Sequence, residues 1–160
     1  MGLVHSQLAK PLFHIWNAFL GKYLDRRDTA MVYYNSNKVF IILDGGKGYQ
    51  ESIFHDEIEG NHNIKIWRDL NNAELEYLKR AYPKLGKEQF ELLIYKLTHL
   101  NIGEMIPFYI MRYGFYEGHT EYRTDPVAIS IIFNLISVNE ADTIFNNDLF
   151  TLLNQHFTGI

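Results

Sequence analysis

The sequence predicts an α+β protein that is mostly α, and three observations lead to this fold class. An amino-terminal stretch repeats apolar residues at three- and four-residue steps, the period of an amphipathic helix. Short runs of β-branched and aromatic residues follow and predict a small antiparallel sheet over about residues 30–68. From Asn71 onward the helical period returns, which predicts a carboxyl-terminal bundle of five to six helices.

The composition indicates one domain spanning residues 1–160. A chain of this length, with 47% hydrophobic and 21% charged residues, can bury a core without metals or disulfides. It has no cysteine, which excludes disulfides, thiolate metal sites and thiol nucleophiles. No signal-peptide pattern and no apolar run near the ~20 residues of a membrane span occur, so we expect a cytoplasmic protein without a membrane partner. The Met1-Gly2 start either fits the loose N-myristoylation consensus or is left from cloning.

The first predicted helix carries a continuous apolar stripe. Ser6 is a plausible cap, and Pro11 fits a helix only near its first turn. The periodicity stops at residues 25–28, where we expect the helix to end. The stripe consists of Leu8, Leu12, Ile15, Trp16, Phe19, Leu20, Tyr23 and Leu24.

The predicted sheet is built from residues 31–34, 38–43 and 63–67, and residues 49–54 are a candidate for another strand. Polar and glycine residues separate these runs in the manner of hairpin turns. The two turns are Asn35-Ser36-Asn37 and Asp44-Gly45-Gly46. Gly-Gly-Lys-Gly at 45–48 lacks the spacing and the Ser/Thr of a phosphate-binding loop, which favours a glycine-rich turn.

Capping signals divide the helical part. Asn72 begins a helix that stops at Pro83, and the next helix, entered after Gly86, runs to Leu100. Residues 106–113 form a third helix, with Gly114 suited to a left-handed carboxyl cap.

Two further start signals lie beyond the third helix. Asp125-Pro126 opens a segment, residues 127–136, that is apolar almost all round and must be buried centrally. Ser137 with Glu140 forms a capping box, and Asn147 or Asp148 starts the last helix.

The connector at residues 113–126 is the first candidate site, because it places charged and aromatic residues between two apolar helices. In the catalytic hypothesis His119 is a general acid or base oriented by Glu117 or Glu121, and Arg123 binds a carboxylate or phosphate. In the structural alternative the arginine pairs with neighbouring carboxylates and the tyrosines pack at the edge of the core. The accompanying candidate binding residues are Tyr113, Tyr116, Glu121, Tyr122 and Asp125.

A second cluster, His55, Asp56, Glu57, Glu59 and His62, has metal-ligand chemistry. Its spacing matches no metal motif, and a solvated loop between strands explains it, so we predict no metal and no cofactor.

The charge distribution suggests a partner. No lysine occurs after Lys96, whereas carboxylates continue to the end of the chain, so a nucleic-acid ligand is not expected. Since no complete catalytic motif is present, the sequence favours a non-enzymatic protein-binding or regulatory module with an acidic helical surface and a basic protein partner. The alternative is a small hydrolase or transferase that acts on an anionic small molecule through His119, Arg123 and a neighbouring carboxylate.

Overall fold

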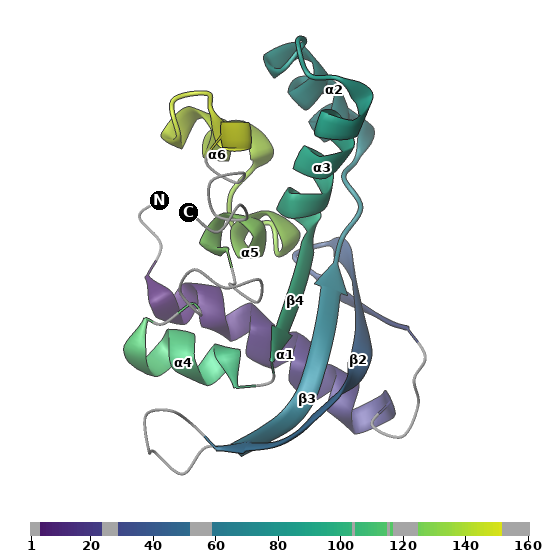
Figure 1. The fold of residues 1–160 in the computed structure, drawn as a ribbon, viewed down its shortest axis with the longest axis vertical. Helices are drawn as coiled ribbons and strands as arrows, with labels where there is room; N and C mark the ends of the chain where they lie inside the picture. The colour runs from purple at the N-terminus through teal and green to yellow at the C-terminus, as the bar shows by residue number, and fades with distance from the viewer. Residues whose placement is uncertain are drawn as a thin grey trace.

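A computed structural model gives the fold of the chain. It describes residues 4–23, 29–51, 59–103, 105–114, 116 and 125–151, with backbone alone for residues 20–23, 44–51 and 59–62. Helices and one antiparallel sheet make up this part, and helical residues outnumber strand residues, which confirms the predicted fold class (Figure 1).

The sheet has four strands in the order β1-β2-β3-β4, and every neighbouring pair is antiparallel. The hairpin between β1 (Ala30–Tyr34) and β2 (Asn37–Glu51) turns through Asn35 and Ser36. Both residues have positive φ, 46° and 66°, which is the requirement of the type I′ turn that suits a two-residue hairpin. The predicted first turn is therefore confirmed.

The second predicted turn is wrong. Asp44, Gly45 and Gly46 lie inside β2, which continues to Glu51 and pairs with β3 (Glu59–Trp67) through two register irregularities. The glycines thus accompany a distortion of a long strand rather than a reversal of the chain. Residues 49–51 of the additional predicted strand belong to β2, and residues 52–54 lie outside the described residues.

The fourth strand, β4 (His99–Gly103), corrects the prediction that everything after Asn71 is helical. It follows α3 (Lys87–Thr98) directly and pairs with β3 from Asn63 to Trp67. The predicted helix to Leu100 therefore ends at Thr98, and the predicted bundle of five to six helices is not confirmed, since a strand interrupts the helical part.

Helix α1 (His5–Tyr23) covers one face of the sheet, and Figure 1 shows it crossing behind β2, β3 and β4. Ser6 lies inside this helix rather than capping it, and Pro11 is at its seventh position, beyond the expected first turn. The core at this face joins the helix stripe to the inward side chains of the strands, among them Leu12, Ile15, Phe19, Val39, Ile41, Ile64, Ile66 and Ile102.

The helix caps follow the sequence closely. Asn71 caps α2 (Asn72–Ala81) in a capping box with Glu74, one position before the expected cap. Gly114 ends α4 (Ile106–Tyr113) at φ 60° and ψ 28°, as predicted. The Ser137 side chain accepts a hydrogen bond from the Glu140 N–H at the start of α6 (Val138–Ile144). Residues 149–151 begin a further helical stretch.

Helix α5 (Pro126–Ile132) is buried on all sides, which confirms the central position predicted for this segment. Ala128, Ile129 and Ile132 belong to the core beneath the sheet, whereas Val127 and Ile131 belong to a second core formed with α2, α3 and α6. The all-round apolarity therefore serves two cores. The helix is shorter than predicted, and Asn134 is exposed at φ 53° just after it.

Candidate functional site

The sheet carries a row of aromatic side chains on the face turned away from α1. The strand register places Met31, Phe40, Trp67 and His99 directly opposite one another across β1 to β4. Tyr95 of α3 extends the row beyond β4 by stacking on His99. We call these five residues the aromatic row.

The rings in this row stand nearly parallel to one another. Phe40 and Trp67 stack at 5.5 Å and 19°, Trp67 and His99 at 6.3 Å and 4°, and Tyr95 and His99 at 4.2 Å and 17°. Neighbouring ring faces are therefore turned toward each other. Such pairs stabilise the sheet by roughly 0.5–1.5 kcal/mol each beyond the area that they bury.

Several apolar side chains on this face are solvent-exposed. Tyr33 is 59% exposed, Tyr95 55% and Met31 44%, and Leu92 is also exposed three residues before Tyr95 on α3. Charged residues lie around them: Lys38 opposite Tyr33, Lys65 on β3, and Asp69 just beyond β3. The outer face thus has an apolar centre and a charged margin of both signs.

His99 contributes one polar atom to the row. The Thr98 hydroxyl donates its only hydrogen to the Ile94 carbonyl at 2.7 Å, so at 2.9 Å from His99 Nδ1 its oxygen can only accept. The neutral imidazole therefore carries its proton on Nδ1 and presents Nε2 as an acceptor. Burial lowers the pKa of His99, and Lys65 adds to this, while the Tyr95 backbone and Asp69 act in the opposite direction.

The predicted catalytic residues His119, Glu117 and Arg123, and the candidate binding residues Glu121 and Tyr122, lie outside the described residues. Their convergence in one site stays a prediction. Both ends of the connector are described, however, and they show how it is attached.

At the first end, His5 of α1 holds the connector. Its Nδ1 lies 2.9 Å from the Tyr116 hydroxyl, and its ring sits over Gly114, where a Cβ would come within 2.7 Å of Nε2. Burial raises the pKa of Tyr116. Tyr113 is 42% exposed. Sequence reasoning missed His5, because 111 residues separate it from Tyr116 and no local pattern joins them.

At the other end, Asp125 is the predicted N-cap of α5. It is 4% exposed, and its Oδ1 accepts a hydrogen bond from the Val127 N–H at 2.8 Å. This carboxylate therefore holds the start of a helix, which is the structural role that its position before Pro126 indicated.

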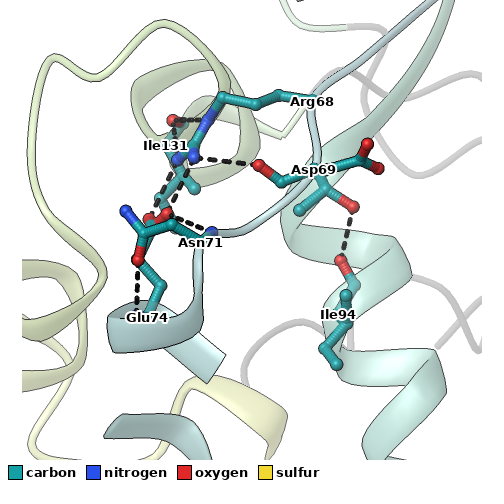
Figure 2. Close-up of polar contacts among 7 residues, drawn as sticks. Arg68, Asp69, Asn71, Glu74, Ile94 and Ile131 are labelled. Carbon is teal, nitrogen blue, oxygen red and sulfur yellow. Dashed lines mark hydrogen bonds and ion pairs between the residues drawn. The ribbon is translucent and has the colours of Figure 1, made fainter. Parts of the chain in front are cut away.

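A buried ion pair lies where β3, α2 and α5 meet (Figure 2). The guanidinium of Arg68, 5% exposed, binds both Glu74 oxygens at 2.8 and 3.0 Å and donates to the Ile131 carbonyl at 2.8 and 3.2 Å. Burial alone would raise the pKa of Glu74, but the hydrogen bonds from Arg68 and from the Asn71 backbone outweigh it and lower the pKa. With its donors directed at protein acceptors, this cluster joins three elements and is not a ligand site.

A second buried carboxylate, Asp142 of α6, is also structural. Tyr77 and Tyr82 donate to its two oxygens at 2.7 and 2.5 Å, and the Tyr82 hydroxyl accepts from the Leu149 N–H at 2.7 Å. Burial first, and then the bond to Asp142, raise the pKa of Tyr77 to about 12 and that of Tyr82 further. These contacts tie α2 to α6.

Among the residues that the structure describes, no three His, Asp or Glu side chains are grouped as a metal site would need. Of the proposed histidine-rich cluster, His55, Asp56 and Glu57 lie outside the described residues, and Glu59 and His62 are described by their backbone in β3 alone. Within the same described part, no helix combines the length and apolarity needed to cross a bilayer.

Comparison with known proteins gives no significant match: no family model fits the chain, and neither a curated protein nor a solved structure resembles it.

Proposed function

We propose that this protein is a non-enzymatic protein-binding module and that the outer face of its sheet is the contact surface. One observation carries the proposal: the face turned away from the core bears Met31, Tyr33, Phe40, Trp67 and Tyr95, where a solvated sheet face usually bears polar residues. Protein interfaces are enriched in aromatic residues and methionine at their centre and are polar at their rim. The outer face has this composition.

The geometry of the aromatic row favours a protein partner over a nucleic acid. Nucleobases bind aromatic side chains by stacking on open ring faces, but here Trp67 and His99 turn their faces to neighbouring rings. Phosphate binding also needs clustered basic residues, whereas Lys38 and Lys65 share this face with Asp69.

The acidic helical surface expected from the sequence has a smaller part in this proposal. Two of its carboxylates, Asp125 and Asp142, are buried and bonded within the protein. Glu140 and Asp148 remain exposed near α6. A basic partner would therefore depend on these two side chains and on acidic residues outside the described part.

The proposal is tested by comparing proteins captured from a cell lysate by wild-type and variant chains. The double variant Tyr33→Ser, Tyr95→Ser removes two exposed tyrosines from the outer face and leaves the core intact. Tyr113→Ser is the matched control, because it removes an exposed tyrosine from α4. A specific partner should be lost with the double variant and kept with the control, and the reverse result would move the interface to the connector.

Direct binding of the captured partner is then measured through tryptophan fluorescence. Trp67 lies half-buried in the aromatic row, whereas Trp16 is 6% exposed within the core. We expect the emission of Trp67 to shift to the blue on binding, because the partner removes water from the indole. An unchanged Trp67 spectrum at saturating partner would exclude the outer face as the contact surface.

A second candidate is a small hydrolase or transferase that acts on an anionic small molecule. The observation that favours it is the contact between His5 and Tyr116, which adds an imidazole to the start of the connector that carries His119 and Arg123. The test is a thermal-shift screen against anions. Stabilisation of the wild type that disappears in both His119→Ala and Arg123→Ala supports this function, and equal stabilisation of all three proteins contradicts it.

A further inference from the structure

Strand β1 is an edge of the sheet in the part of the chain that the structure describes. It pairs with β2, and no backbone hydrogen bond joins its other side to a described residue. Edge strands are usually protected by charges, proline or bulges, because their open N–H and C=O groups can pair with another chain. The sequence of β1, Ala-Met-Val-Tyr-Tyr, contains none of these devices.

The hairpin geometry fixes which backbone groups point outward. In a two-residue hairpin the residues that flank the turn, here Tyr34 and Asn37, form a hydrogen-bonded pair. Because hydrogen-bonded and non-hydrogen-bonded pairs alternate, Val32 also bonds to β2, whereas Met31 and Tyr33 direct their N–H and C=O groups away from it. The available edge therefore offers four backbone groups, two from each of these residues.

We propose that a second copy of this chain pairs with β1 edge to edge and antiparallel, with Val32 at the two-fold axis. This register sets Met31 opposite the partner's Tyr33, and Tyr33 opposite the partner's Met31. Both pairs are then hydrogen-bonded pairs, so each exchanges two backbone hydrogen bonds and all four outward groups are satisfied. The two sheets become one continuous antiparallel sheet.

The side chains agree with this register. Met31 and Tyr33 point to the outer face, where they are 44% and 59% exposed, so each would cover its opposite in the other copy. Methionine sulfur makes favourable contacts with aromatic rings, and cross-strand pairs of this kind stabilise a sheet. A second copy is the occupant that we propose, because β1 is complementary to itself in this register and carries no charge that would oppose the pairing.

The interface is small, so the dimer should be reversible and depend on concentration. Sedimentation equilibrium of the full chain over a range of concentrations should give a mass that rises from 18.8 kDa toward twice that value. The double variant Met31→Lys, Tyr33→Lys places like charges opposite each other in both pairs. We expect it to weaken the dimer by at least about tenfold. The Tyr95→Lys variant, which changes the same face at the far side of the sheet, should leave the dimer intact.

Mixtures of single variants test the register. Met31→Lys mixed with Tyr33→Glu brings opposite charges together across the axis and should form a heterodimer. Met31→Lys mixed with Met31→Glu places its charges diagonally rather than opposite and should recover less. Circular dichroism checks that each variant is folded. We expect folding to be kept, because the substituted positions are exposed. A wild type that stays monomeric up to about 1 mM, a Kd that needs only about −4 kcal/mol of binding free energy, overturns the proposal. Equal recovery in the two mixtures also overturns it.

Discussion

The substitution Glu74→Gln is expected to destabilise the protein by breaking the ion pair at the junction of β3, α2 and α5. Glutamine keeps the size of the side chain and can still serve in a capping box with Asn71. The substitution therefore isolates the charge. It leaves the guanidinium of Arg68 buried without its counter-ion.

The expected cost follows from the burial of the two partners. Arg68 is 5% exposed and Glu74 17% exposed, with a bidentate contact at 2.8 and 3.0 Å. An exposed ion pair contributes about 0–1 kcal/mol, whereas removing one partner of a buried pair costs about 3–5 kcal/mol. We expect a loss of unfolding free energy of about 2–3 kcal/mol, below the buried-pair range, because water reaches part of Glu74 and the glutamine oxygen can still accept a hydrogen bond. That corresponds to a fall in Tm of about 4–12 °C for a chain of this size.

Urea unfolding followed by circular dichroism measures this loss, and a double-mutant cycle with Arg68→Met assigns it to the pair. The methionine keeps an apolar stem but removes the donors to Glu74 and to the Ile131 carbonyl. We expect a coupling free energy of at least about 1 kcal/mol. Additive effects, with a coupling below about 0.5 kcal/mol, would refute the argument that the pair acts as a unit.

Acid titration adds an independent check on the same pair. Because the folded state lowers the pKa of Glu74 below its ordinary 4.5, its stabilisation is complete above that value and is lost as the pH falls through the folded pKa. The stability difference between wild type and Glu74→Gln should therefore shrink below about pH 4.5. A difference that stays constant down to pH 3 would contradict the reasoning.

Three further predictions concern single contacts. Tyr82→Phe should cost about 2 kcal/mol in urea unfolding, because it leaves a buried oxygen of Asp142 and a backbone N–H without their partner; a cost below about 0.5 kcal/mol would show that water replaces the hydroxyl. Gly114→Ala should lower the free energy of unfolding by more than the ~1 kcal/mol expected for an alanine in the left-handed region, because its Cβ would meet the His5 ring. The loss beyond ~1 kcal/mol should disappear when the substitution is made in the His5→Ala variant. His99→Gln should flatten the rise of stability with pH. Burial lowers the folded pKa of His99, so its neutral form stabilises the protein above the unfolded value of about 6.5 and this is lost as the pH falls below it; an unchanged pH profile would count against a buried imidazole.

The sequence predicted the local parts of this fold well. Asn35, Gly114, Asp125 and Ser137 each occupy a turn or cap whose requirements are met within a few residues. It failed at β4, because Leu97 and Leu100 continue the helical spacing of α3, and only two inward residues, Leu100 and Ile102, mark the strand. Those residues are extended because β3 pairs with them, and this long-range interaction leaves no local signal.

In the candidate site, too, local features could be predicted from the sequence and long-range contacts could not. The proline that follows Asp125 predicted that this residue caps a helix, and in the structure Asp125 is the N-cap of α5. The contact between His5 and Tyr116, and the row through Phe40, Trp67 and His99, depend on how distant segments meet. Phe40 and Trp67 were predicted as strand residues, but His99 was predicted in a helix, and the register that aligns the three was not visible in the sequence.

Ring stacking explains part of the apolar outer face but not all of it. Stacking accounts for Phe40, Trp67 and His99, because each ring covers a neighbour and is itself half-buried. It does not account for Met31 and Tyr33, which are 44% and 59% exposed at an uncharged edge strand. Polar side chains at these two positions would leave the core beneath α1 unchanged, since that core uses the opposite face of β1. Their apolar character is thus best explained by a contact outside the single chain, and the edge of β1 is where that contact should be sought first.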